Sequence, residues 1–213
     1  MTVAGVLALV ALLLIVPGPL HAERARDLAD LDDRTSVQAR QRGARALGQS
    51  GTMSDLPALV RALRDADPAV RALSETSMWE IWSRSGDEEI DRLFAVGVEQ
   101  MSAREADAAL QTFSRIIGRR PDFAEGWNKR ATIYYLLGEY ERSLADCAEV
   151  MRRNPYHFGA LSGYGMIFLR LAEPETALGY FERALAINPN LAGVEEAAQA
   201  LRRLLVEKRK STL

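Results

Sequence analysis

Residues that could carry out enzymatic chemistry are sparse in this sequence, and their spacing does not bring them together. The chain has one cysteine, Cys147, and two histidines, His21 and His157. A reactive thiol needs a cationic or basic neighbour to lower its pKa, and no histidine is close to Cys147 in sequence. We therefore interpret Cys147 as a small core residue. A single cysteine also excludes a disulfide within the chain.

Other catalytic and ligand-binding patterns are also missing from the sequence. It has no His-Glu-x-x-His zinc motif and no phosphate-binding loop, and Gly163-x-Gly165 falls inside a predicted helix instead of a turn. Two pairs of acidic residues are adjacent in sequence and do not converge: Asp32-Asp33 and Glu88-Glu89. We predict no catalytic residues, no metal site, no cofactor and no enzymatic activity.

Composition indicates a helical protein without a strong overall charge. The chain of 213 residues carries 27 Lys and Arg against 29 Asp and Glu, so no overall charge attracts it to nucleic acid or to an anionic membrane. Leu, Ala, Arg and Glu are frequent and β-branched residues are sparse, which favours helices. We expect an all-α fold.

The N-terminus begins with an uncharged apolar run, Val3 to Val16, followed by Leu20-His21-Ala22. This run fits the apolar region of a secretory signal and is shorter than the roughly 20 residues that span a bilayer. We predict a signal peptide over residues 1–22, cleaved after Ala22, and a periplasmic or otherwise exported protein. Because no Lys or Arg precedes the run, a retained inner-membrane anchor stays open as an alternative.

Residues 23–35 are charged and are predicted to form a linker or a frayed helix, whereas 36–85 show helical periodicity. The run DLPALVRALRDADPAVRALSE within this segment resembles a HEAT-type helical repeat. The resemblance implies that Asp65 and Arg71 take part in a hydrogen-bonded ladder. Two tryptophans, Trp79 and Trp82, lie three residues apart on one helical face, and we expect them to pack against the following hairpin.

A period of 34 residues then runs through 86–190. Six columns of similar residues recur at this spacing: Leu93, Trp127 and Leu161; Gly97, Ala131 and Gly165; Ala109, Ser143 and Ala177; Phe113, Cys147 and Phe181; Ile116, Val150 and Ala184; Pro121, Pro155 and Pro189. The columns resemble the tetratricopeptide repeat (TPR) family over Ile90 to Asn190, with units at 90–121, 124–155 and 158–190. The first unit is degenerate, since Gln100 and Arg104 replace an aromatic residue and a glycine.

These resemblances imply a right-handed α-solenoid of antiparallel helix pairs: a HEAT-like segment, about three TPR units, and a capping helix with a basic tail over 191–213. Small residues at Gly97, Ala131 and Gly165 are expected to let paired helices approach closely.

In TPR proteins the first helix of each unit lines a concave groove that holds a peptide or a helix of a partner. Carried over by position, the groove residues are Phe94, Val98, Met101, Asn128, Lys129, Thr132, Tyr135, Leu136, Met166 and Arg170. The Lys and Asn clamp that some members use for a peptide carboxylate is incomplete, because Ser162 and Met166 stand where cations are needed.

The sequence therefore predicts an exported, non-enzymatic scaffold that binds another protein, with no nucleic acid or metal as partner. Two alternatives remain open. The chain could self-associate through the Trp79/Trp82 region or the terminal helix. It could instead be a membrane-tethered assembly subunit of an envelope complex, which requires that residues 1–22 are retained.

Overall fold

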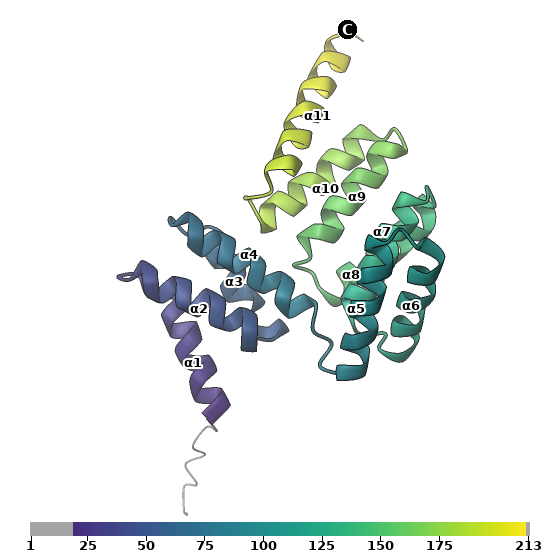
Figure 1. Ribbon diagram of the computed structural model, residues 1–213. Coiled ribbons are helices and arrows are strands. Elements are labelled where there is room, and N and C mark those ends of the chain that lie inside the picture. Colours follow the sequence, from purple (N-terminus) through teal and green to yellow (C-terminus); the bar gives the residue numbers. More distant parts are fainter. Residues whose placement is uncertain (1–18, 212–213) are drawn as a thin grey trace, which may run out of the picture.

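The computed structural model describes residues 19–211, and within them every regular element is a helix (Figure 1). The predicted apolar signal segment, Val3 to Val16, lies outside the described residues. The helices are α1 (Pro19–Leu31), α2 (Val37–Ser50), the short η1 (Met53–Asp55), α3 (Leu56–Ala62), α4 (Pro68–Trp82), α5 (Glu88–Ser102), α6 (Ala106–Arg119), α7 (Ala124–Leu136), α8 (Tyr140–Arg153), α9 (Phe158–Arg170), α10 (Pro174–Ile187) and α11 (Ala192–Ser211). The all-α fold class is confirmed.

Three helix pairs, α5/α6, α7/α8 and α9/α10, stack in chain order, and α11 packs on α10 (Figure 1). The first pair begins where the sequence indicates, because the Asp87 carboxylate caps α5 by accepting hydrogen bonds from the amides of Glu89 and Ile90 at 2.9 and 3.2 Å. This arrangement confirms the predicted solenoid.

The small residues of the 34-residue period face large ones inside each pair. A Cβ atom on Gly97 would lie 2.6 Å from Cζ of Phe113, and one on Gly165 would lie 2.3 Å from Cε1 of Phe181. Both phenylalanines are buried. Glycine is therefore needed at these positions for close approach of the two helices.

The turn inside each pair uses left-handed backbone at positions 34 residues apart. These positions are Arg104 (φ 62°), Gly138 (φ 78°) and Ala172 (φ 58°). Glycine adopts this conformation freely, whereas a residue with a Cβ atom pays about 1 kcal/mol. Arg104 and Ala172 thus carry backbone strain that Gly138 avoids.

Of the two expectations for the segment 23–35, the structure shows a helix instead of a linker, because most of the segment belongs to α1. Leu31 is 4% exposed and Leu28 packs on the same apolar cluster. Arg24 Nε donates to Asp55 Oδ1 at 2.8 Å, which ties α1 to the start of α3. The sequence signal for this helix is weak because the helix has few apolar residues. Its contacts with the rest of the protein hold it in place.

The predicted packing of the tryptophan pair against the following hairpin is wrong. Trp82 stacks on His157, with ring centroids 4.4 Å apart and planes at 18°, and Trp79 meets Phe158 edge-on at 5.4 Å. Both partners lie at the start of α9 in the third pair. The tryptophans of α4 therefore pack on the start of α9 and not on the α5/α6 hairpin that follows α4 in the sequence.

The same docking continues at the residues that directly follow α3. Arg64 Nη1 donates to the carbonyl of Ile187 at 3.1 Å, and Asn190 Nδ2 donates to the carbonyl of Leu63 at 2.8 Å. Helices α3 and α4 therefore share one apolar core with α9 and α10.

The ladder implied for Asp65 and Arg71 takes a different form. The Asp65 carboxylate pairs with Arg40 of α2 at 2.7 Å, while Arg71 Nη1 donates to the backbone carbonyl of Asp65 at 2.8 Å. Burial by itself raises the pKa of Asp65. The hydrogen bonds from Arg40 and the Asp67 amide lower this pKa by more than burial raises it, so the carboxyl titrates below its ordinary value. Membership of 36–85 in the HEAT family stays a prediction.

Candidate functional site

The predicted groove residues of the second and third pairs come together between α7 and α9. A cavity of about 140 Å³ separates the two helices, and its lining includes Asn128, Thr132, Tyr135 and Met166. Arg170 Nε donates to the Tyr135 hydroxyl at 3.2 Å, which links the two helices at their C-terminal ends. The period of 34 residues thus places these side chains on one face, as expected.

The first pair contributes less to this face than the sequence predicts. Val98 is exposed and Met101 is partly buried. Phe94 is only 8% exposed, because its ring packs edge-on against Phe113 at 5.9 Å and Phe123 at 5.4 Å. Phe94 is a core residue, and its assignment to the groove is corrected.

The predicted polar residues Asn128 and Lys129 contact a buried hydrogen-bonded pair, Glu125 and His157. Glu125 and His157 are both fully buried, with Oε1 and Nε2 2.6 Å apart. Asn128 Nδ2 donates to Glu125 Oε2 at 3.1 Å, and Lys129 Nζ lies 3.6 Å from the same carboxylate. Asn128 and Lys129 would therefore have to break their contacts with Glu125 in order to bind a ligand.

The protonation of this pair follows from its hydrogen bonds. The amide of Ala160 donates to His157 Nδ1 at 3.0 Å, so that nitrogen carries no proton and Nε2–H donates to Glu125. Burial by itself raises the pKa of Glu125, but the facing His157, Lys129 and Asn128 lower it below its ordinary value. The carboxylate stays ionised inside the protein.

His157 was not among the predicted functional residues, although the sequence contains a signal for it. The 34-residue period aligns His157 with Phe123 and Leu191. A histidine in an otherwise apolar column indicates a buried polar contact, and the structure supplies it from Glu125.

Helix α4 covers the face where α7 and α9 begin. Trp82 lies on His157, and Cη2 of Trp79 would lie 2.7 Å from a Cβ atom on Gly159. Gly159 follows Glu125 by 34 residues, so the two hold equivalent positions in the first turns of α9 and α7. The accessible part of the face is its second half, where Thr132, Leu136, Met166 and Arg170 are exposed.

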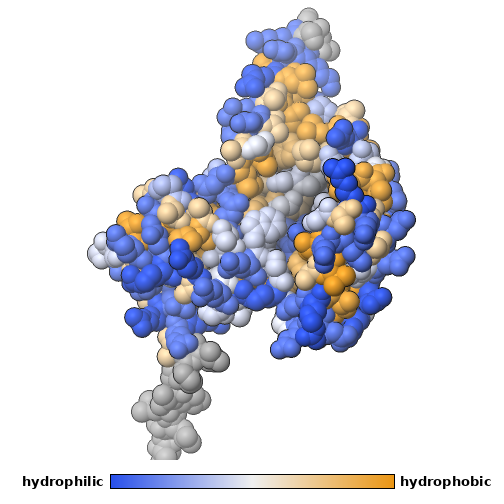
Figure 2. Space-filling view, in the orientation of Figure 1, coloured by the Kyte–Doolittle hydropathy of each residue, from blue (hydrophilic) through white to orange (hydrophobic). Residues whose placement is uncertain are grey.

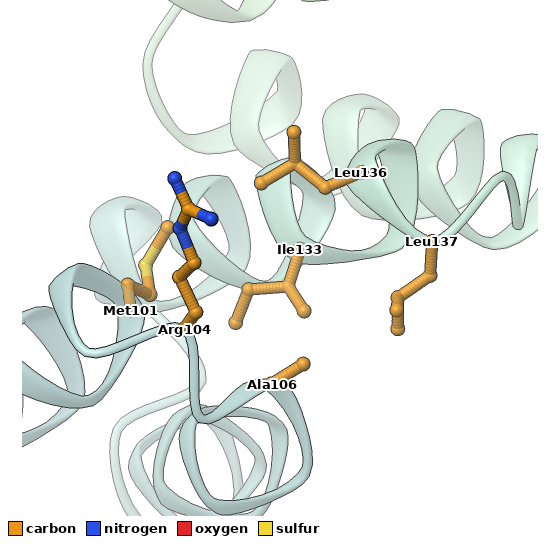
Figure 3. Close-up of a pocket in the computed structure, with 6 residues that line it drawn as sticks. All are labelled: Met101, Arg104, Ala106, Ile133, Leu136 and Leu137. Carbon is orange, nitrogen blue, oxygen red and sulfur yellow. The ribbon is translucent and has the colours of Figure 1, made fainter.

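A larger apolar cavity opens beside this second half, between the α5–α6 turn and α7 (Figure 3). Its volume is about 400 Å³, and its lining residues are Met101, Arg104, Ala106, Ile133, Leu136 and Leu137. Leu136 is 72% exposed and Leu137 is 47% exposed. Figure 2 shows hydrophobic residues gathered over the α5 and α7 region and along the side of α11 next to α10. Of the residues that line this cavity, the sequence assigns only Met101 and Leu136 to the groove, and it marks Arg104 only as a departure from the glycine of the repeat.

Cys147 behaves as the interpretation of the sequence expects. It is 3% exposed, and burial together with the nearby Asp146 raises the pKa of its thiol to about 12. Between residues 19 and 211 there is no cluster of three or more potential metal ligands. None of the helices in that range is both long and apolar enough to cross a membrane.

Stacked antiparallel helix pairs with a period of 34 residues define a helical-repeat protein. A TPR repeat-containing protein of Rhizobium etli is 33% identical over 145 residues, and the alignment covers 68% of each of the two proteins. This chain belongs to the TPR repeat proteins. No family model matches the sequence.

More distant relatives share only part of the chain. Anaphase-promoting complex subunit 3 of Schizosaccharomyces pombe is 32% identical over 87 residues, which cover 41% of this chain and 13% of that protein.

Solved TPR domains confirm the fold. The first TPR domain of Spaghetti, bound to an HSP90 peptide, superposes with a TM-score of 0.53 at 20% identity, covering 56% of this chain and 94% of that domain. The Sgt2 TPR domain from Aspergillus fumigatus gives a TM-score of 0.54 at 19% identity, over 58% and 83% of the two chains.

Proposed function

We propose that this protein is a non-enzymatic scaffold that binds a peptide or a helix of a partner protein through the second half of its groove. The binding surface consists of Thr132, Tyr135, Leu136, Met166 and Arg170. The observation that carries the proposal is the exposure of Leu136, at 72%, and of Met166, at 41%, on helices whose other large apolar residues are buried or partly buried.

Exposed apolar side chains clustered on one face mark interaction surfaces in soluble proteins. Aromatic residues, methionine and arginine are enriched at the centre of protein interfaces, and Tyr135, Met166 and Arg170 are of these types. A TPR domain of similar fold, that of Spaghetti, holds a peptide of HSP90. The chemistry of this face therefore suits a segment of another protein.

The proposal is tested with the double variant Tyr135→Ala and Leu136→Ala, compared with Leu204→Ala on α11. Leu204 is 51% exposed and lies away from the groove. Both variants are expected to keep the helical circular dichroism and the melting temperature of the unchanged chain. Only the double variant should lose capture of the partner. Unfolding of the double variant, or equal capture by all three proteins, contradicts the assignment.

The proposal extends to export of the chain, supported by the uncharged run from Val3 to Val16. Cleavage after Ala22 would remove Pro19 to Ala22 from α1 and leave Arg24, which pairs with Asp55 at 2.7 Å. N-terminal sequencing of the protein from its native host distinguishes the outcomes. A start at Glu23 supports export, and an intact residue 1–22 segment supports a membrane-tethered subunit.

Self-association is a second candidate function, and α11 is the surface that favours it. Leu204 and Val206 are each 51% exposed near the end of this helix. The tryptophan route to self-association is not supported, because Trp82 is 3% exposed and its ring contacts His157. Light scattering at micromolar concentration tests this candidate, and a monomer contradicts it.

A further inference from the structure

The geometry points to a specificity subsite at the cavity beside α7, where Arg104 pairs with a carboxylate of the bound segment while a neighbouring apolar side chain of that segment fills the cavity. This inference rests on the proposed function and names the chemistry of the partner. The expected occupant is a peptide segment with a Leu-, Met- or Phe-sized residue next to Asp or Glu.

The cavity can accept an apolar side chain. Ala106 closes one side of the cavity. In Figure 3 the side chains of Ile133 and Leu137 point toward Ala106 from the opposite side. Met101 bounds the cavity from the end of α5. A space of about 400 Å³ lined almost wholly by aliphatic groups favours an apolar group over water.

Arg104 supplies the charge at the edge of this space. It is the charged member of the six lining residues, and Figure 3 shows its side chain extending between Met101 and α7. Among the side chains that the structure describes, no carboxylate pairs with Arg104, although Glu105 follows it directly. A guanidinium held beside an apolar surface is complementary to a carboxylate next to an apolar side chain.

The backbone at Arg104 gives independent support. Its φ of 62° is the left-handed conformation that Gly138 adopts at the equivalent position of the next pair. Arginine is unfavourable there relative to glycine, and residues held in unfavourable backbone conformations are concentrated at functional sites. Ala172 has the same backbone strain without a charged side chain, and it does not line the cavity.

The cavity is open to solvent, and an open cavity suits a side chain of a bound peptide better than a free small molecule. Binding sites for free small molecules usually bury about 70–90% of the ligand. Here Leu136 and Leu137 are 72% and 47% exposed, so a free ligand would stay largely in water. A side chain of a longer segment that also contacts the groove face needs no such enclosure.

The test is selection of random 12-residue peptides on the immobilised full chain, followed by affinity measurement on variants. Arg104→Gly removes the charge and relieves the backbone strain, so lost binding cannot reflect lost folding. Ala172→Gly is the matched control, because it relieves the same strain in the third pair. We expect selected peptides to share an apolar residue adjacent to Asp or Glu. Their affinity should fall about tenfold or more with Arg104→Gly and stay unchanged with Ala172→Gly.

The outcomes separate this inference from the proposed function. Peptides that lose binding with Tyr135→Ala and Leu136→Ala but bind Arg104→Gly normally would overturn the subsite and leave the groove in place. Failure to select any peptide would overturn both. Selected peptides without an acidic residue beside the apolar one also contradict the subsite.

Discussion

Single glycines decide how closely the paired helices approach. Gly165 faces Phe181, and an added Cβ atom would lie 2.3 Å from the ring. We predict that Gly165→Ala lowers the free energy of unfolding by about 1–3 kcal/mol through overpacking. The control is Gly179→Ala in α10, where no atom lies within 4 Å of the added Cβ. That variant should gain about 0.5–1 kcal/mol from helix propensity. Denaturant unfolding measures both, and equal effects would contradict the packing account.

The buried Glu125 makes stability depend on pH. Its pKa is lower in the folded chain than in the unfolded one, so the stabilisation is fully present above the ordinary glutamate value of about 4.3 and is lost as the pH falls through the folded pKa. We predict that Glu125→Gln flattens the fall in unfolding free energy below about pH 4.3.

The control for this prediction is Glu99→Gln, at an exposed position of α5. It should keep the pH dependence of the unchanged chain, measured by chemical unfolding at a series of pH values. Identical profiles for Glu125→Gln and the unchanged chain would show that the buried pair is not the source.

The thiol of Cys147 should resist alkylation in the folded protein. Burial raises its pKa to about 12, so almost no thiolate forms at neutral pH. Iodoacetamide is expected to modify Cys147 in denaturant and to leave it unmodified in buffer at pH 8, as read by mass spectrometry. Rapid modification of the folded chain would place the thiol at the surface.

At the scale of elements, the docking of α4 on α9 is the contact that shapes the accessible face. Trp82 is 3% exposed and stacks on His157. We predict that Trp82→Ala lowers the free energy of unfolding by about 3–5 kcal/mol. It should also speed hydrogen exchange at the Ala160 amide, which donates to His157.

A suitable comparison for this variant is Met53→Ala, since Met53 is 43% exposed in the same N-terminal region. Its effect should stay within about 0.5 kcal/mol. If Trp82→Ala is equally mild and leaves exchange at Ala160 unchanged, α4 does not hold the start of α9.

The helix pairs are predictable from the sequence because each depends on contacts between neighbours in the chain, and the 34-residue period repeats them. The docking of α4 is not predictable in this way. Trp82 and His157 lie far apart in sequence, and no period relates them. The same limit applies to Phe94: position alone assigns it to the groove, whereas its burial depends on Phe113 and Phe123. The sequence marks Arg104 as a departure from glycine, but only the structure shows the cavity beside it.

For the whole molecule, the N-terminal helices share an apolar core with α9 and α10 around Met78, Trp82 and Phe158, whereas the first helix pair has a cluster of its own around Phe94 and Phe113. Helix α4 covers the start of α9 through Trp79 and Trp82, so the proposed binding surface lies on the C-terminal halves of α7 and α9. The proposed scaffold function therefore rests on a short, partly apolar face bordered by Arg104 and Arg170, in place of a long open groove.

The most direct test of that claim is site-specific photo-crosslinking in the native host. A photoreactive amino acid at Thr132, on the accessible half of the groove, is compared with one at Ala148, exposed on α8. The account predicts one discrete crosslinked protein from position 132, lost when Tyr135 and Leu136 are both changed to alanine, and none from position 148. No crosslink at 132, or the same crosslinked protein at both positions, would contradict it.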